Sequence, residues 1–534
     1  MKKHTKILLA ILSGVLLSPA YYQWGTGFMI FIGLIPILFV EDAMYEKREA
    51  NKTRHILPYA ILAFMIFTVL TVWWVKNSVW VALLASMIVV PSFMVLPFLL
   101  FHYVKRISGP RLGYVTLVVT WIAFEYLHQH VKINFPWIHL GNAFADDVLF
   151  IQWYEITGTQ GGSLWVLLIN ILLFKLLKGL FADFSLRKHR GLISWILGIL
   201  LFPILVSIVR FYSYEEERRP YECVVLQPNI DPWAKFHDPQ DIQTIELLQL
   251  ADSIVSGTTD YIIGPETFLN QNVWQYAMDQ NRDINRFYEF VEDYPRANFI
   301  IGAMTYKRYL PGDTLSATAK KLGNKGLYYD SFNSALQLDS SRVIQMYHKS
   351  LLVAGVEWMP AFNRFKFIQK LAVDLGGITR SHGTQEERSV FISPQDGVKV
   401  APVICWESVF GEFVTEYVRE KGAEFIFIIT NDGWWKDTPG HRQHNSYARL
   451  RAIETRRSIA RSANTGISSL INQKGEILES IGWWQRSAIK RTLNANDHLT
   501  FYVKHGDYIA RISSFLSVLL VLYAFIRKRV FKRT

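Results

Sequence analysis

The placement of long apolar runs constrains this chain of 534 residues more than any other feature. The runs crowd into the first 210 residues and recur once near the C-terminus, with a segment of ordinary globular composition between them. Runs of about 17–25 apolar residues can cross a bilayer as helices. We therefore expect a helical membrane domain at residues 1–211, a water-exposed domain at 212–507, and a last membrane helix with a basic tail at 508–534.

Eight runs qualify as transmembrane helices. They are expected near 6–22, 25–41, 56–75, 79–103, 112–128, 161–178, 191–211 and 508–526. The first also fits a cleavable signal peptide, but further runs follow it directly, so we interpret it as an uncleaved helix. Glu125 lies in the fifth run, and an acidic residue there is a functional candidate. Its position near the end of the run also fits a hydrogen-bonded structural role.

The basic residues between the runs predict the orientation. Lys and Arg concentrate at the N-terminus, after the second, fourth and sixth runs, and in the C-terminal tail. The alternate segments, YYQWGT, VKNS and 129–160, are poor in Lys and Arg. Because cytoplasmic loops carry the excess of these residues, we expect both termini in the cytoplasm and residues 212–507 on the outer side of the cytoplasmic membrane.

Charge and cysteine content narrow the class of protein. The net charge of +12 could attract nucleic acid, but many basic residues flank the apolar runs and no nucleic-acid motif is recognisable. We therefore expect no nucleic-acid partner. Two cysteines do not form a disulfide framework, although an oxidising compartment would permit one bridge between Cys223 and Cys405.

Residues 212–507 alternate short apolar runs with helical patterns. The continuous runs are typical of strands buried on both faces, and they are ECVVLQPNI, DYIIGPE, NFIIGAMTY, SALQLD, VKVAPVICWE and EFIFIITND. NRDINRFYEFVEDY and HNSYARLRAIETRRSIARS predict helices, and SSLINQKGEILES predicts a hairpin that turns at Gly475. The alternation predicts a layered α/β domain. The glycine-rich stretch 374–388 is expected to be a mobile loop.

The stretch VICWESVF places Cys405 where a predicted strand ends and a predicted helix, SVFGEFVTEYVREKG, begins. Cys405 could be a small buried hydrophobe, half of a disulfide, or a nucleophile. A helix N-terminus stabilises a thiolate and lowers the pKa of a thiol from its usual value of about 8.5. The position therefore resembles a nucleophile elbow. Cys223 precedes no helical pattern and is expected to be plain core.

Two further strand ends carry charged residues, at the edge where α/β domains usually place their sites. Glu266 follows a strand in IIGPETFLN and could act as a general base, although a solvated loop acid or a helix cap would look the same. Lys349 follows a strand in QMYHKSLLVAGVEWMP. A lysine can stabilise an oxyanion by its fixed charge, but surface lysines are common. Each residue alone is weak evidence.

Together, Glu266, Lys349 and Cys405 resemble the triad of the nitrilase superfamily, whose members have a four-layer α-β-β-α fold. With membrane spans on both sides, the chain resembles the apolipoprotein N-acyltransferase family of bacteria, the membrane-embedded branch of that superfamily. The resemblance covers nearly the whole chain. It is carried by FPWIHLGNA, GTQGGSLW, VVLQPNI, GPET, YHKSLLVAGVEWMP, VICWESVF and TNDGWW…HNSYARLRAIETRRSIARSANTGIS.

The resemblance implies roles for these residues. Cys405 would form an acyl thioester, Glu266 would accept the thiol proton and later an amine proton, and Lys349 would hold the oxyanion. Supporting or substrate-binding roles would fall to Glu357, Trp406, Glu407, Phe236 and Trp233. Three positions depart from the family pattern: AGVE replaces Pro-Phe-Gly-Glu, Trp406 replaces the usual Tyr, and Phe236 replaces a favoured Trp. These departures concern the substrate pocket and not the triad.

The function implied is an N-acyltransferase of the bacterial inner membrane. It would move an acyl chain from a phospholipid, through a cysteine thioester, to the N-terminal amine of diacylglyceryl-modified apolipoproteins. Two lipid substrates too large for one pocket favour a ping-pong course. No metal or other cofactor is implied, and we expect a monomer.

Two other functions fit parts of the sequence. A membrane-tethered nitrilase-like amidase or hydrolase would use the same triad with water as the acceptor. A transporter or a catalytically silent scaffold would not need Cys405, and the small number of charges within the apolar runs argues against a transporter.

Overall fold

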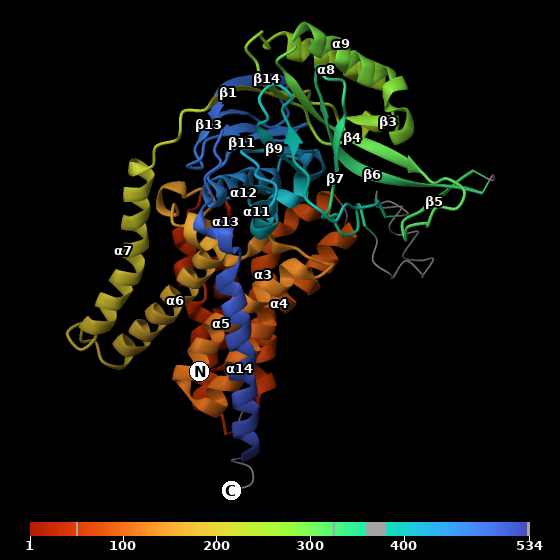
Figure 1. The fold of residues 1–534 in the computed structure, drawn as a ribbon. Helices are drawn as coiled ribbons and strands as arrows, with labels where there is room; N and C mark the ends of the chain where they lie inside the picture. Colours follow the sequence, from red (N-terminus) through yellow and green to blue (C-terminus); the bar gives the residue numbers. More distant parts are fainter. Residues whose placement is uncertain (50–51, 79, 324–325, 359–380, 531–534) are drawn as a thin grey trace. The chain divides into compact units, whose positions relative to one another are not determined.

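The computed structural model describes residues 1–534 except 50–51, 79, 324–325, 359–380 and 531–534 (Figure 1). The chain divides into two compact units. One contains Met1–Trp73, Leu83–Tyr214 and His505–Thr534, and the other contains Trp74–Ala82 and Glu215–Lys504. Part of the loop expected to be mobile, 374–380, lies outside the described residues.

The first unit is a bundle of long helices. They are α1 (Lys3–Leu17), α2 (Ile35–Glu46), α3 (Leu57–Val72), α4 (Trp80–Ser108), α5 (Pro110–His130), α6 (Tyr154–Ala182), α7 (Arg190–Ser213) and α14 (Tyr508–Val530). Short 3-10 turns join several of them. Helix α14 packs along α5, so the C-terminal end of the chain completes a bundle that the N-terminal end begins (Figure 1).

Within the described residues, seven helical segments are long and apolar enough to cross a membrane, where we expected eight. They are Lys3–Tyr21, Gly27–Glu46, Thr53–Asn77, Ser86–Ser108, Tyr154–Ala182, Arg190–Ser213 and Tyr508–Val530. The run expected at 112–128 does fold as helix α5. Its polar residues, which include Arg111, Glu125 and His128, lower its mean hydropathy, and α5 is not among the seven.

Glu125 has hydrogen-bond partners inside this bundle. Its Oε1 accepts from Trp121 Nε1 at 3.1 Å and from the Leu140 backbone N–H at 2.9 Å. Leu140 begins the 3-10 turn Leu140–Phe144, within the stretch FPWIHLGNA. These contacts support the structural role considered for Glu125, because its carboxylate ties this turn to α5.

The second unit contains two β-sheets. One sheet has the order β14-β1-β2-β4-β6-β5, with β3 beside β4 and β7 beside β6. Its strands are β1 (Pro220–Gln227), β2 (Tyr261–Ile263), β3 (Leu269–Trp274), β4 (Asn298–Arg308), β5 (Lys320–Leu322), β6 (Leu327–Leu338), β7 (Gln345–His348) and β14 (Ser487–Asn494). The other sheet has the order β13-β12-β11-β10-β9-β8. Its strands are β8 (Phe391–Ile392), β9 (Lys399–Ile404), β10 (Phe425–Thr430), β11 (Ser458–Ala463), β12 (Ser468–Ile471) and β13 (Ile477–Ile481).

Helices cover the outer face of each sheet. Helices α8 (Gln240–Asp252) and α9 (Arg282–Asp293) pack on the first sheet, and α11 (Gly411–Arg419) and α12 (Pro439–Thr455) pack on the second. Strands β1 and β11 meet between the two sheets. A short helix, α13 (Phe501–His505), precedes α14. This order of helix, sheet, sheet and helix confirms the four-layer α-β-β-α fold.

The strand pairing explains where the polar strand ends gather. Strands β1, β2 and β4 run parallel, as do β9, β10 and β11. Parallel strands bring their carboxyl ends to one edge of a sheet, and burial on both faces favours continuous apolar runs. Strand β10 follows this rule, since all six of its residues are buried.

Two local predictions have different outcomes. The predicted hairpin is confirmed as β12 and β13, with Gly475 at φ +81° between them. The helix predicted over HNSYARLRAIETRRSIARS is wrong in its second half. Helix α12 ends at Thr455, Arg456 adopts a left-handed conformation (φ +52°), and Ser458–Ala463 form strand β11.

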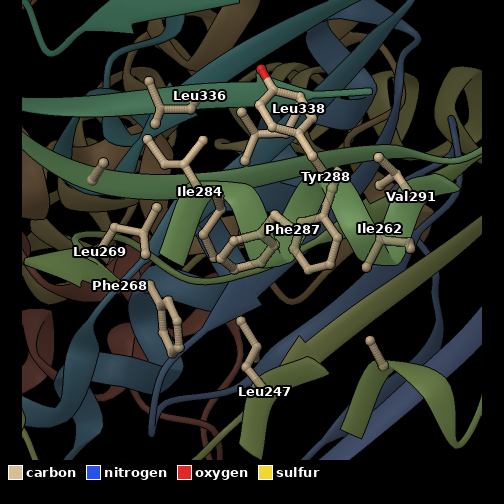
Figure 2. Packing of buried hydrophobic residues seen from close by; sticks show 14 of the residues in the cluster. Leu247, Ile262, Phe268, Leu269, Ile284, Phe287, Tyr288, Val291, Leu336 and Leu338 are labelled. Carbon is tan, nitrogen blue, oxygen red and sulfur yellow. The ribbon is translucent and has the colours of Figure 1, made fainter. Parts of the chain in front are cut away.

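Figure 2 shows the apolar core between the first sheet and its helices. Helix α9 contributes Ile284, Phe287, Tyr288 and Val291, which are spaced so that one helical face is buried. Helix α8 contributes Leu247, which is fully buried, whereas Ile245 on the same helix is 42% exposed. The core thus depends on one face of each helix.

Truncation of Leu247 and of Ile245 to alanine should separate the effect of burial on stability from the effect of helix propensity. Leu247→Ala is expected to reduce the free energy of unfolding by about 2–5 kcal/mol, because it removes buried methyl groups and leaves a cavity. Ile245→Ala should change it by about 0.5 kcal/mol or less. Thermal unfolding of the full chain in detergent would measure both. Equal shifts in the two variants would contradict this packing.

Candidate active site

Glu266 lies in the turn that follows strand β2 and is only 6% exposed. Its Oε1 accepts hydrogen bonds from Asn333 Nδ2 at 2.8 Å and from Lys349 Nζ at 3.2 Å. Strand β4 passes so close to this turn that a Cβ on Gly302 would lie 2.5 Å from the Glu266 Cα. The turn therefore requires glycine at that point of β4.

Lys349 follows strand β7 and is almost completely buried. Its Nζ also lies 2.9 Å from the carboxylate of Glu357, so one ammonium group serves two carboxylates. The side-chain amide of Asn333, on β6, donates to both carboxylates at 2.8 Å. The backbone carbonyl oxygen of Asn333 accepts from the Lys349 backbone N–H, also at 2.8 Å. Asn333 is thus a member of the site that sequence analysis did not select.

Charge interactions fix the protonation states in this cluster. Burial by itself would lower the pKa of Lys349, but Glu266 and Glu357 outweigh it, so the pKa lies well above its usual range. Burial would likewise raise the pKa of Glu357, but Lys349 and the Val353 N–H hold it below its usual range. The site therefore keeps a permanent positive charge beside ionised Glu357.

Cys405 follows strand β9 and has φ +49°, a left-handed conformation that is unusual for a residue with a side chain. It begins a five-residue 3-10 turn, Cys405–Val409, before α11 starts at Gly411. Glu407 anchors this turn from a fully buried position. The Glu407 carboxylate accepts from the Ile404 and Ser350 backbone N–H groups at 2.9 and 2.7 Å, and so joins the Cys405 turn to the residue after Lys349.

The expected activation of the thiol by a helix N-terminus is not found. The α-helix begins six residues after Cys405, and only a short 3-10 turn intervenes. Burial raises the pKa of the Cys405 thiol well above its usual range; Glu266 raises it further and Lys349 lowers it in part. These interactions favour a neutral thiol, so a nucleophilic role would require that a base remove its proton.

A second buried network holds Cys405 from the other side of the turn. Asp432 pairs with Arg461 Nη2 at 2.6 Å and with His444 Nδ1 at 2.9 Å. His444 Nε2 lies 3.2 Å from the Cys405 carbonyl oxygen. Ser408 Oγ donates to that same oxygen at 2.7 Å. The signal that could have identified this network is a polar residue after strand β10 with a histidine on the next helix, in TNDGWW…HNSYAR.

Cys405, Asp432 and His444 offer ligand atoms within 4.8 Å of one another. These groups already have partners, because Arg461 neutralises Asp432 and both ring nitrogens of His444 are engaged. A metal ion would have to displace Arg461. The network is better suited to hold the backbone of Cys405 in its unusual conformation.

Trp74, in the 3-10 turn Trp73–Asn77 that follows α3, packs against residues next to this network. Trp74 is 1% exposed; its Nε1 donates to Gln443 Oε1 at 3.2 Å, and its ring centroid lies 4.8 Å from that of Trp435. A Cβ on Gly440 would lie 2.6 Å from the Trp74 ring. Helix α12 can approach Trp74 this closely because residue 440 is glycine.

The predicted aromatic residues occupy different environments. Trp406 is buried and its ring packs edge-on against Phe410. Trp233 and Phe236 are 55% and 44% exposed, and Trp233 contacts Trp434. No hydrogen bond, ion pair or ring contact among the described residues joins Trp233 or Phe236 to the Glu266–Lys349 cluster.

The two cysteines are both free, so the bridge considered between them is not present. Cys223 lies fully buried on β1 of the first sheet, and Cys405 follows β9 of the second. The expectation that Cys223 is core is confirmed. Cys405 retains partial exposure.

Family models match both parts of the chain. Residues 13–172 match the apolipoprotein N-acyltransferase N-terminal domain, and residues 225–498 match the carbon-nitrogen hydrolase family. The chain is similar to the apolipoprotein N-acyltransferase of Chlorobaculum tepidum, with 26% identity over 98% of this chain and 97% of that one. It is also similar to the apolipoprotein N-acyltransferase of Geobacter metallireducens, with 25% identity over 98% of this chain and 96% of that one.

Among solved structures, a CN-hydrolase superfamily protein from Xanthomonas campestris aligns with a TM-score of 0.35 and 16% identity. The alignment covers 55% of this chain and 97% of that one. The carbon-nitrogen hydrolase match spans more than half of the 534 residues, and the N-terminal match lies within the helical part. The chain therefore belongs to the carbon-nitrogen hydrolase family, in the multi-pass membrane branch that carries the apolipoprotein N-acyltransferase N-terminal domain.

Proposed function

We propose that this protein transfers an acyl chain from a membrane phospholipid to the N-terminal amine of diacylglyceryl-modified lipoproteins. One observation carries the proposal. A thiol, a buried carboxylate and a buried ammonium group act on one another in a chain similar over its full length to apolipoprotein N-acyltransferases. Acyl transfer through a thioester needs a nucleophile, a proton acceptor and a charge for the tetrahedral oxyanion.

In the first half-reaction, the Cys405 thiol gives its proton to the Glu266 carboxylate as the sulfur attacks an ester carbonyl of the phospholipid. The carbonyl oxygen gains negative charge, which the Lys349 ammonium stabilises. When the tetrahedral intermediate collapses, the ester C–O bond breaks and the lysophospholipid oxygen takes the proton from Glu266. The acyl chain is then held as a Cys405 thioester.

In the second half-reaction, the lipoprotein amine attacks the thioester carbonyl and Glu266 accepts an amine proton. The C–S bond breaks, an amide forms, and the proton returns to the Cys405 sulfur. Burial disfavours a negative charge on the Cys405 sulfur. The sulfur is therefore a good leaving group only if Lys349 and the proton returned by Glu266 neutralise that charge.

Neighbouring residues would support these steps. Glu357 would keep the Lys349 ammonium in place, and Glu407 would fix the Cys405 turn. Trp233, Phe236 and Trp406 would provide apolar surface for acyl chains, since large aromatic side chains contribute most of such contact area. No metal or cofactor has a step in this scheme.

The scheme assigns catalysis to the domain at residues 212–507, between seven spans and a last one at 508–534, in a chain that acts as a monomer. The distribution of Lys and Arg supports an outer, periplasmic location for this domain and cytoplasmic termini.

The first test is mass analysis of the full chain after incubation with a phospholipid of defined acyl chains. We expect an acyl adduct on Cys405 that hydroxylamine removes. The adduct should be absent from Cys405→Ser and present in Cys223→Ala, which removes the other thiol. Release of free fatty acid faster than transfer to a diacylglyceryl lipopeptide would favour the hydrolase instead.

The second test concerns the base. Glu266→Gln keeps the size and hydrogen-bonding ability of the side chain but removes its proton affinity. We expect formation of the Cys405 adduct to slow by about 10²–10⁴-fold, the usual contribution of a general base. Glu289→Gln, at an exposed position on α9, is the matched control and should leave the rate unchanged. An unchanged rate in Glu266→Gln would exclude Glu266 as the base.

The third test concerns orientation. In a chain without its native cysteines, Asp313→Cys and Arg187→Cys each place one thiol at an exposed position. A membrane-impermeant maleimide should label the first in cells whose outer membrane alone is permeabilised. The second should be labelled only after the inner membrane is opened. The reverse pattern would overturn the proposed topology.

A further inference from the structure

Lys235 is fully buried, yet no ion pair joins it to a carboxylate in the described part of the chain. Its Nζ donates instead to the Glu266 carbonyl oxygen at 2.9 Å and to Thr267 Oγ1 at 3.1 Å. A buried lysine without an ion-pair partner is costly, because burial disfavours the charged form. The steps proposed above give this residue no role.

The turn that Lys235 contacts has an unusual conformation. Thr267 has φ +47°, which is rare for a β-branched residue. A strained conformation of this kind persists only where the surroundings enforce it. Strand β4 constrains the turn at Gly302, where a Cβ would lie 2.4 Å from the Thr267 nitrogen. The Lys235 side chain adds its two hydrogen bonds, to the Glu266 carbonyl oxygen and to Thr267 Oγ1.

Lys235 also belongs to a well-anchored segment. It lies in the 3-10 turn Ala234–Phe236, and its backbone N–H donates to the Asp231 carbonyl oxygen at 2.9 Å. Its own carbonyl oxygen accepts from Gln243 Nε2 at 3.0 Å and from Asn270 Nδ2 at 3.1 Å. The backbone of Lys235 is thus fixed to α8 and β3, so its side chain can hold the turn of Glu266.

The charge state of Lys235 follows from its surroundings. Burial lowers the pKa of Lys235 to about 7, and the Glu266 carboxylate opposes this shift. The side chains from α8 and β3 that bond its backbone, Gln243 and Asn270, are uncharged. Asp231, earlier in the same segment, directs its carboxylate to the N–H groups of residues 233 and 234. A neutral lysine amine has two N–H groups, and these match the two acceptors present, the Glu266 carbonyl oxygen and Thr267 Oγ1.

We propose that Lys235 is a positioning residue for the base: it holds the Glu266–Thr267 turn through its two hydrogen bonds, and its protonation slows acylation of Cys405. The proposal rests on the proposed function. A positive charge next to Glu266 attracts its carboxylate charge, which makes that carboxylate a poorer proton acceptor. Acylation should therefore become faster as pH rises through the region near 7, where Lys235 loses its proton.

The experiment measures single-turnover acylation of Cys405 in the full chain, with phospholipid vesicles of defined acyl chains, from pH 6 to 9. The wild-type rate should rise through pH 7. Lys235→Met should abolish that rise and reduce the rate at high pH by roughly tenfold, since small displacements of a catalytic group are costly. Lys235→Arg keeps its charge throughout and should be slow at every pH. Lys490→Met, which removes a partly exposed lysine of β14, should behave as wild type.

Wild-type rate and pH profile in Lys235→Met would overturn the proposal. If that variant does not fold, Thr267→Val removes one of the two acceptors at nearly constant shape. It should be slower than wild type and keep the rise near pH 7, and an unaltered rate would count against the proposal. Absence of any adduct in the wild type would overturn the proposed function instead. The pH profile of Cys405 alkylation by iodoacetamide then tests Lys235 separately, with a shift expected in Lys235→Met and none in Lys490→Met.

Discussion

The site depends on one ammonium group, that of Lys349, which two buried carboxylates share. Two buried carboxylates this close would repel each other if the positive charge were absent. Asn333 adds a neutral hydrogen-bond donor to both carboxylates. Glu266 follows β2, Asn333 lies on β6, Lys349 follows β7, and Glu357 comes later in the segment after β7. The cluster therefore also fixes the relative positions of these strands.

The position of Cys405 depends on a different principle, the control of a backbone dihedral angle. A left-handed residue after a strand directs its side chain away from the sheet, but that conformation costs free energy. Glu407 binds the N–H groups of Ile404, just before the turn, and of Ser350, after Lys349. Ser408 and His444 approach the Cys405 carbonyl oxygen. Buried Asp432 and Arg461 orient His444 in turn. In the proposed scheme, the reactivity of Cys405 would therefore come from geometry and from Glu266 as a base, and not from a thiolate at rest.

The membrane helices, the layered α/β domain and most of its strands could be predicted from the sequence, because long apolar runs and strands buried on both faces leave a local pattern. The strand ends at Glu266, Lys349 and Cys405 are visible for the same reason. Helix α5 has a lower mean hydropathy than the other predicted spans because of its polar residues. Strand β11 was assigned to a helix because Arg457 and Arg461, like Ser458 and Ser462, are four residues apart, which is a helical spacing. Asn333 and Lys235 could not be selected. Each belongs to the site because it contacts Glu266, which lies 67 residues from Asn333 and 31 residues from Lys235 in the chain, and no local pattern records such a contact.

Trp74 has a consequence for how the catalytic part can be isolated. It belongs to a short connection between two membrane helices, yet its indole fills the space that glycine leaves on α12, about one turn from His444 in the network that holds Cys405. A fragment that began at residue 212 would contain Glu266, Lys349 and Cys405 and still lack this ring. It would expose Trp435 and the surface of Gly440 to water. The sequence boundary of the α/β domain is therefore not its structural boundary, because the structural unit also includes Trp74. A soluble version would need a replacement for this tryptophan.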